Sequence, residues 1–348
     1  MVVYWLLFLY FAAGAMREQA RPAGARRADL LLRFGGVAMA LVIGLRFQVG
    51  GDWKPYEYIF AAARYETLGT LPAIADPGYY LINIAVQWLG GDLWLVNVLC
   101  AAIFTWGLMR FAEAQERPWL ATLVAIPYLV IVVAMGYTRQ AVSIGLIMAG
   151  LVTYFRTGSL IRFAVFVLFA ATFHKTAIVA VPLVAFGNER GRVINVLVAL
   201  AITYLLYYLF LSATVGLLVT NYIDRRYGSE GAGIRVAMSV VPALLFLARR
   251  RLMGFSDRER AVWRNMSLAA LGCLLLLLLT PSSTAVDRLA LYVIPLQLAV
   301  LSRPRSIMTS EGFGTILIIF YAAAVQFTWL NFAHHASYWL PYRLWPFG

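Results

Sequence analysis

Ionisable side chains that could handle a phosphorylated sugar recur along this chain at the edges of apolar segments. Arginine suits phosphate oxygens, because its planar guanidinium donates hydrogen bonds in a fork. A neutral imidazole or a carboxylate can take the proton from a sugar hydroxyl. Together these residue types fit transfer of a group from a diphosphate onto a hydroxyl. The candidates are Arg46, Asp52, Asp76, Arg139, His174, Lys175, Arg225, Arg226, Asp287, Arg288 and Arg343.

Arg139 begins an apolar segment as Arg139-Gln140-Ala-Val-Ser143, so Arg139 and Ser143 share one helix face. Gly136 and Tyr137 precede it and predict a tight turn between two spans. An arginine that reaches out to lipid headgroups is the alternative. The turn favours a functional arginine, with Gln140 beside it.

His174 and Lys175 interrupt an apolar stretch, and a hydrogen-bonded interhelical histidine is the alternative to a general base. Lys175 favours the neutral imidazole and attracts phosphate. Asp52 is the other possible base, unless it only pairs with Arg46 or Lys54.

Other polar positions carry weaker signals. Trp53, Tyr56 and Tyr79 suit sugar faces, and they equally suit the aromatic belt of a membrane interface. Asp76-Pro-Gly is locally a turn signature, and Asp287 could pair with its neighbour Arg288. His334 and His335 lack a carboxylate or cysteine at ligand spacing, so no metal site is expected.

The composition is that of a multi-spanning membrane protein, since 62% of the 348 residues are hydrophobic. A net charge of +13 could indicate nucleic acid binding, but the basic residues form short clusters between apolar segments. That pattern is typical of loops held on the cytoplasmic side, so nucleic acid is excluded. Cys100 and Cys273 lie inside apolar segments, which argues against an exposed disulfide.

An all-α fold of about 12 transmembrane or re-entrant helices is predicted, as one domain over 1–348. Residues 49–92 form an outer loop in which 79–89 is an interfacial or re-entrant helix. A break at His174 makes two short segments of 160–186. The expected segments are 2–16, 30–48, 93–111, 119–136, 139–155, 160–173, 174–186, 193–218, 235–248, 262–280, 289–302 and 314–333.

Charge predicts the orientation, with both chain termini outside. Most of the 29 basic residues fall in alternate loops, which the positive-inside rule places in the cytoplasm. The candidate residues then share the outer face. The basic loops are 17–29, 110–118, 156–162, 187–192, 249–264 and 302–306.

Four ordered motifs resemble the EpsG-type exopolysaccharide polymerases, relatives of the Wzy polymerases of O-antigen and capsule assembly. They are Arg46-Phe-Gln-Val-Gly-Gly-Asp52-Trp53-Lys-Pro-Tyr56, Asp76-Pro-Gly-Tyr79 with Asn83, Arg139-Gln140-Ala, and Phe173-His174-Lys175-Thr-Ala177. Later in the chain only Asp287-Arg288 with Tyr292 and the aromatic C-terminal end fit. Trp53 stands where a tyrosine is common, and Lys175 where a small residue is usual.

The resemblance implies a glycosyltransferase of the bacterial inner membrane that needs no cofactor or metal. Its substrates would be oligosaccharide repeat units on undecaprenyl diphosphate, joined at the periplasmic face. A flippase and a chain-length regulator would be its partners. One alternative is a C-type glycosyltransferase that uses a polyprenyl-phosphate sugar, although Asp52 has no acidic neighbour. A membrane O-acyltransferase and a lipid-linked oligosaccharide flippase are the others.

Overall fold

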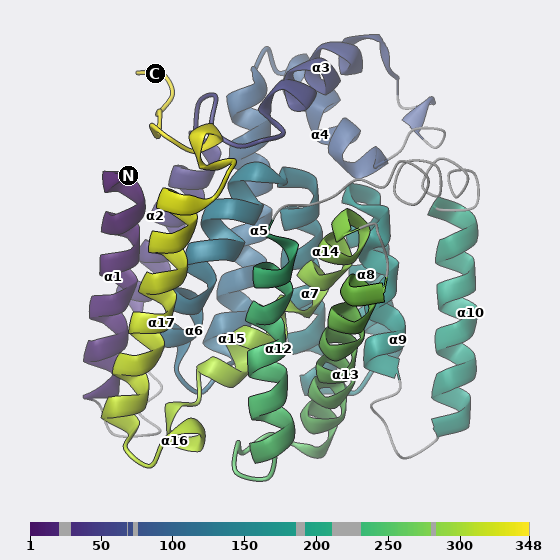
Figure 1. Ribbon diagram of the computed structural model, residues 1–348. Helices are drawn as coiled ribbons and strands as arrows, with labels where there is room; N and C mark the ends of the chain where they lie inside the picture. Colours follow the sequence, from purple (N-terminus) through teal and green to yellow (C-terminus); the bar gives the residue numbers. More distant parts are fainter. Residues whose placement is uncertain are drawn as a thin grey trace.

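The computed structural model describes residues 1–20, 29–67, 69–71, 76–185, 192–210, 231–279 and 283–347. Within these ranges the chain is helical, and one isolated β-bridge pairs Arg46 with Leu344. The helices run side by side in one bundle, and both chain ends lie at the same end of it (Figure 1). The predicted all-α fold is confirmed.

Within the described residues, every segment expected from hydrophobicity coincides with helical structure; residues 186, 211–218 and 280 of these segments lie outside the described ranges. The longer helices are α1 (Val2–Gln19), α2 (Leu30–Gly44), α5 (Leu93–Glu113), α7 (Thr138–Thr157), α10 (Arg192–Phe210), α12 (Ala232–Arg249), α13 (Asp257–Leu279) and α17 (Glu311–Phe332). The shorter ones include α6 (Pro118–Ala125) with the π-helix η3 (Ile126–Ala134), α8 (Leu160–Phe173), the 3-10 helix η4 (Lys175–Val179) with α9 (Ala180–Ala185), and α14 (Ser283–Ala290) with η7 (Leu291–Val293) and α15 (Ile294–Leu301).

Five stretches of the described chain are long and apolar enough to cross a membrane by themselves. They are Leu93–Glu113, Ala232–Arg249, Asp257–Leu279, Ser283–Leu301 and Glu311–Phe332. Shorter apolar helices in this part of the chain are Leu30–Gly44, Pro118–Ala134, Leu160–Phe173, Lys175–Ala185 and Val196–Phe210. A helical membrane protein is therefore shown, but the count of about 12 spans is not supported.

The predicted outer loop folds into α3 (Trp53–Ala62), η1 (Ala63–Tyr65) and α4 (Pro77–Trp88). These helices lie beyond one end of the bundle (Figure 1). Tyr56 and Tyr79 are buried there in an apolar cluster with Val96 and Cys100 of α5 and Phe173 of α8. Burial of these aromatic rings fixes the loop on the bundle and so places Asp52 and Asp76, the residues before α3 and α4.

The chain reverses at His174, as the sequence predicts. α8 ends at Phe173, His174 is extended with φ −154°, and η4 begins at the next residue. Near the start of α13, Asn265 donates a 3.0 Å hydrogen bond to the Leu183 carbonyl. Arg258, also in that first part of α13, donates to the Phe155 carbonyl, shortly before α8 begins. The two short segments therefore leave and return to the same end of the bundle.

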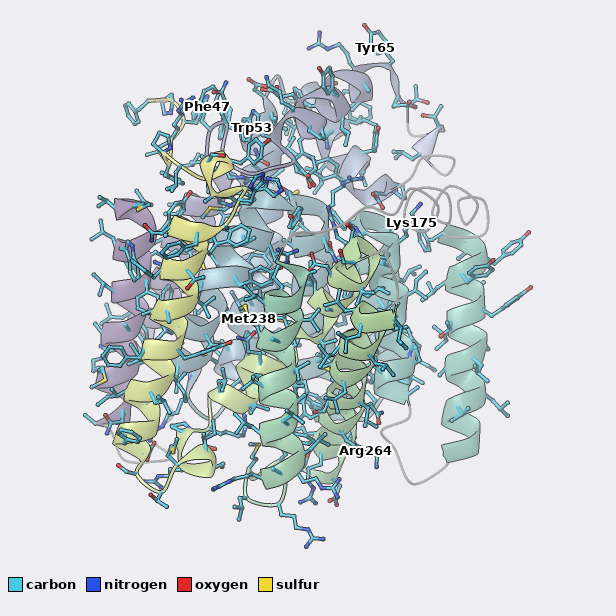
Figure 2. All side chains as sticks on the ribbon, viewed as in Figure 1. Phe47, Trp53, Tyr65, Lys175, Met238 and Arg264 are labelled. Carbon is cyan, nitrogen blue, oxygen red and sulfur yellow. The ribbon has the colours of Figure 1, made fainter. Side chains whose placement is uncertain are left out.

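Basic residues from several predicted cytoplasmic loops meet at the end of the bundle opposite α3 and α4. Arg303 donates to Gln115 at 3.2 Å and to the Met253 carbonyl at 3.0 Å. Arg117 forms an ion pair with Glu311. Figure 2 places Arg264 at this end, whereas Trp53 and Lys175 lie toward the other. Basic residues of the predicted cytoplasmic loops therefore lie together at one end of the folded bundle, as the predicted orientation requires.

The C-terminal segment after α17 includes η8 (Ala336–Tyr338) and packs against the turn at Gly50, which precedes α3. The Gly50 amide donates to the Tyr338 carbonyl at 2.8 Å. Trp339 is buried and donates from its indole nitrogen to the Ile131 carbonyl at 2.7 Å. Gly50 has φ +109°, a conformation that favours glycine. The turn is thus held against both the π-helix and the C-terminal segment.

Single cysteines should report which end of the bundle faces outward. In a background with Cys100→Ala and Cys273→Ser, we expect Gly69→Cys to react with a membrane-impermeant maleimide in intact cells. Gly254→Cys should react only after the membrane is opened, because its loop belongs to the basic end. Labelling of Gly254→Cys in intact cells would overturn the orientation.

Gly50 and Gly51 provide a matched pair for the tight turn. A Cβ on Gly50 would lie 2.1 Å from the Met135 carbonyl oxygen, whereas one on Gly51 would meet nothing closer than 3.8 Å. Strain alone costs about 1–3 kcal/mol at such a backbone position. Gly50→Ala should therefore lower the melting temperature of the purified protein clearly, and Gly51→Ala should leave it nearly unchanged. Equal melting temperatures would show that the turn is not constrained.

Candidate functional site

Arg139, near the start of α7, lies between an aromatic ring and a carboxylate. Its Nη1 donates to Asp76 Oδ2 at 2.5 Å. Its guanidinium carbon lies 5.8 Å from the centre of the Tyr56 ring, a cation–π distance. The Arg139 side chain keeps 29% of its surface exposed, so a ligand can reach it. Of the atoms in this pair, Asp76 Oδ1 and Arg139 Nε are buried without a hydrogen-bond partner.

Asp76 therefore does more than form a turn. It has φ +60°, a left-handed conformation that is uncommon for a residue other than glycine, and Pro77 begins α4 directly after it. Burial raises the pKa of Asp76, while Arg139 and Lys175 act in the opposite direction. This strained, buried carboxylate positions the Arg139 side chain.

His174 lies within a network of hydroxyl groups. Its Nδ1 is 2.6 Å from Thr176 Oγ1 and 3.2 Å from the Tyr292 hydroxyl. Tyr292 in turn lies 3.4 Å from Ser143 Oγ on α7. Burial lowers the pKa of His174 to about 3, and the cations Arg288, Arg139 and Lys175 act in the same direction. The imidazole is therefore neutral at physiological pH, as a general base requires.

Arg288, on α14, contacts Gln140, the residue that follows Arg139 in α7. Its carbonyl accepts a 2.8 Å hydrogen bond from Gln140 Nε2, and its Nη1 lies 3.4 Å from Gln140 Oε1. The guanidinium carbon is 4.3 Å from the centre of the Tyr137 ring. These contacts join α14 to the start of α7, and so place a second arginine at the site.

Asp287 does not pair with Arg288, which corrects the local pairing considered from the sequence. Its Oδ1 accepts a 2.8 Å hydrogen bond from Arg235 Nε, and both side chains are largely buried. Arg235 was missed by the sequence analysis. An arginine at the start of the apolar segment 235–248 was the available signal, because isolated charges within membrane helices are usually paired.

Asp52 is partly buried near two cations. Neither partner considered from the sequence holds it, because Lys54 pairs with Glu57 at 2.8 Å and Arg46 bonds elsewhere. Among the described residues, no ion pair forms with Asp52. Burial raises the pKa of Asp52, with Arg288 and Arg139 opposing this effect. Its carboxylate is therefore near both arginines and remains available as an alternative base.

Arg46 occupies a different place from the one predicted. It is 1% exposed and donates to the Val49 and Ile43 carbonyls, to Asn97 and to Thr138, at 3.2, 2.6, 3.2 and 2.7 Å. These contacts leave the guanidinium inside the protein. Arg46 is thus a positioning residue, and its predicted contact with a diphosphate does not agree with this geometry.

Of the remaining predicted residues, some are buried in the wall of the site and the others lie away from it. Tyr79 is fully buried, and Trp53 is largely buried with its indole donating to Glu57 at 2.8 Å. Both form the wall beneath the site rather than an exposed sugar platform. Arg343 donates to Gln48 at 2.8 Å in the C-terminal segment. Arg225 and Arg226 lie outside the described residues.

Lys175 completes the set of cations and is partly exposed. Burial lowers the pKa of Lys175, Asp76 raises it, and Arg139 lowers it. In the described part of the chain, no group of three His, Cys, Asp or Glu side chains could hold a metal ion. The site thus brings together Arg139 of α7, Arg288 of α14, Lys175 of η4, and His174, Asp52 and Asp76, which immediately precede η4, α3 and α4.

Comparison with known proteins gives one family. No curated protein and no solved structure matches the chain significantly. The model of the EpsG family matches residues 29–344, which include every described site residue. This match confirms the resemblance that the ordered motifs indicate, and the chain belongs to the EpsG family.

Proposed function

We propose that this protein joins oligosaccharide repeat units carried on undecaprenyl diphosphate. Membership of the EpsG family supports a polysaccharide polymerase in general. The observation that supports the specific proposal is the proximity of His174 to the cations Arg139, Arg288 and Lys175 at one end of the helical bundle. Diphosphate needs cations, and the acceptor hydroxyl needs a base.

In the proposed reaction, Arg139 and Arg288 bind the diphosphate of the donor lipid. The acceptor hydroxyl gives its proton to Nε2 of His174 and bonds to the anomeric carbon of the donor sugar. The bond between that carbon and the diphosphate oxygen breaks, and its electron pair leaves with the lipid diphosphate. The arginines stabilise this charge where it develops.

The location of the cations favours this reaction over transport. A transporter would place polar groups near the middle of the membrane, at helices broken in repeated halves. Here Arg139, Lys175 and Arg288 gather with α3 and α4 at one end of the bundle, and Figure 2 shows Lys175 there. We assign this end to the outer face of the inner membrane, where a flippase would deliver substrate and a chain-length regulator would act.

Purified protein in liposomes, supplied with a polyprenyl-diphosphate-linked repeat unit, should form a ladder of products spaced by one repeat. Neither a nucleotide sugar nor a metal ion should be needed, because the donor is already activated. The ladder is read by gel or mass spectrometry. A C-type glycosyltransferase would instead add one sugar from a polyprenyl phosphate, and a flippase would form no ladder. Either result would refute the polymerase proposal.

Arg139→Lys should lose most of the polymerase activity, because a point charge cannot replace a bidentate fork to phosphate. The exposed Arg64 in η1 provides the control, since Arg64→Lys makes the same chemical change outside the site. Initial rates of repeat addition are compared at equal protein levels. Near-wild-type rates for Arg139→Lys would contradict the bidentate role and would indicate that Arg139 only anchors the helix at the membrane surface.

His174→Ala should abolish chain elongation while the protein still folds, because loss of a general base typically costs about 10²–10⁴-fold in rate. Asp52→Asn should cost less. Rates are measured on both variants after their melting temperatures have been matched to the wild type. The reverse order, with an inactive Asp52→Asn and an active His174→Ala, would move the base to Asp52.

A further inference from the structure

We propose that a pocket between α3, the start of α5 and the C-terminal segment binds one uncharged sugar ring of the lipid-linked oligosaccharide. The pocket has a volume of about 250 Å³, and the described side chains that line it are five aromatic residues, a leucine and two carboxylates. Pockets for drug-sized ligands hold about 300–1,000 Å³, so this one suits a smaller group. Its chemistry favours a sugar by itself, whereas its part in chain elongation rests on the proposed function.

Aromatic side chains from separate segments meet at the pocket. The rings of Trp94, on α5, and Trp345, in the C-terminal segment, are stacked with their centres 4.4 Å apart. Phe47 lies edge-on to Trp53 with ring centres 5.8 Å apart, and Figure 2 shows both at the end of the bundle where Lys175 lies. Trp94, Trp345 and Phe47 remain partly exposed. The apolar C–H face of a sugar ring can therefore pack against aromatic surface here.

Two carboxylates supply hydrogen-bond acceptors. Glu57 accepts from the Trp53 indole on Oε1 and from Lys54 on Oε2, both at 2.8 Å, and these bonds hold it in place. The hydrogen bond from Lys54 lowers the pKa of Glu57, so this carboxyl is ionised at neutral pH. Asp92 accepts the Leu93 amide on Oδ1 at 2.6 Å. An ionised carboxylate has about four acceptor positions, so both can also accept from sugar hydroxyls.

The charges of the lining favour an uncharged sugar over a phosphate group. Among the described residues that line the pocket there are Glu57 and Asp92 but no arginine or lysine. Lys54, which pairs with Glu57, keeps 72% of its side-chain surface exposed. A lipid phosphate or an acidic sugar would meet like charge in the pocket, which opposes binding. The pocket is thus the electrostatic opposite of the cationic site around Arg139.

Helix α3 joins the pocket to the candidate site. Trp53, Glu57 and Phe60 recur at the spacing of one helix face and form one side of the pocket. On the adjoining face, the Tyr56 ring lies 5.8 Å from the guanidinium carbon of Arg139. A sugar in the pocket would therefore lie beside an oligosaccharide whose diphosphate is bound at Arg139.

Backbone hydrogen bonds hold Trp345 at the pocket. The Trp345 amide donates to the Leu45 carbonyl at 2.8 Å, and the Phe47 amide donates to the Arg343 carbonyl at 3.0 Å. These bonds pair the C-terminal segment with the chain between α2 and α3. Because they involve only the backbone, a variant without the Trp345 side chain can still make them.

Saturation-transfer NMR can detect a sugar in the pocket without any polymerase activity. The probes are methyl glycosides of glucose, galactose, mannose and N-acetylglucosamine, with methyl glucuronide as the acidic sugar and glycerol 1-phosphate as the lipid headgroup. At least one neutral glycoside should receive saturation from the wild-type protein, and Trp345→Ala should lose this signal. Trp88→Ala is the matched control and should keep it, because Trp88 is exposed at the end of α4, outside the pocket.

Three results would overturn the proposal. They are no saturation of any neutral glycoside, an equal signal from Trp345→Ala, and saturation of glycerol 1-phosphate alone. The last result would indicate a site for lipid headgroups.

Asp92→Asn with Glu57→Gln tests the two charges, and does so even if Trp345→Ala fails to fold. Asparagine caps a helix about as well as aspartate, so the start of α5 should stay intact. Neutral glycosides should bind more weakly, because hydrogen bonds to ionised acceptors are the stronger ones. Methyl glucuronide should bind better than it does to the wild type, because the like charge is gone. Unchanged binding of both kinds of sugar would refute the role of the carboxylates.

Kinetics connect the pocket to chain elongation. Trp345→Ala should raise KM for the lipid-linked repeat unit about tenfold, equal to about 1.4 kcal/mol, with little change in kcat. Trp88→Ala should change neither constant. An unchanged KM for Trp345→Ala would overturn the assignment of the bound sugar to the oligosaccharide.

The sugar pocket and the polymerase proposal fail separately. If neutral glycosides bind through Trp345 but no product ladder forms, the sugar pocket stands and the polymerase proposal is wrong. If the ladder forms and no glycoside binds, the pocket proposal is wrong and the polymerase proposal stands.

Discussion

The buried guanidinium of Arg46 connects the elements on which the site depends. It donates to the carbonyl of Ile43 at the end of α2, to that of Val49 in the turn that follows, to Asn97 on α5 and to Thr138 at the start of α7. A charge in this position is stable only when it is well hydrogen-bonded, because an isolated buried charge costs several kcal/mol. The same requirement fixes the Gly50 turn on one side and the first residues of α7 on the other. Asp52 and Arg139 are direct neighbours of these two fixed points, so their separation follows from the Arg46 contacts.

Charge balance explains why the site is open to an anion. Arg139 shares Asp76, whereas Arg288 contacts an amide and an aromatic ring in the described structure. Lys175 adds a further positive charge close by. Cations held near low-dielectric protein are stabilised when an anionic ligand arrives, since Coulomb attraction there is stronger than in water. Among the described residues, the cations Arg139, Arg288 and Lys175 outnumber the carboxylates Asp52 and Asp76, which supports the proposed binding of a diphosphate at this site.

The sequence predicted the fold to the extent that hydrophobicity and charge determine it. Apolar runs located the helices, and the placement of His174 between two short segments was correct because a histidine and a lysine cannot continue a lipid-facing helix cheaply. Side-chain partners were predicted less well. Arg46 appeared equivalent to Arg139 in the sequence, and only packing shows that one is enclosed and the other accessible. Thr176 and Arg235 were missed, because a threonine in a turn and an arginine near a helix start have many ordinary explanations.

Backbone strain and burial also distinguish the residues that hold the site in place from those that could take part in the reaction. Gly50 and Asp76 have positive φ angles; Gly50 lies two residues before Asp52, and Asp76 is itself a residue of the site. Their cost is met by aromatic packing of Trp339 over the Gly50 turn and of Tyr79 beneath the arginine. Such strain persists only where the surrounding structure determines the geometry completely. His174 is also held by its surroundings, at the reversal between α8 and η4 and not on the face of a helix. In this position its Nδ1 contacts the hydroxyl groups of Thr176 and Tyr292, and its Nε2 has no partner among the described residues.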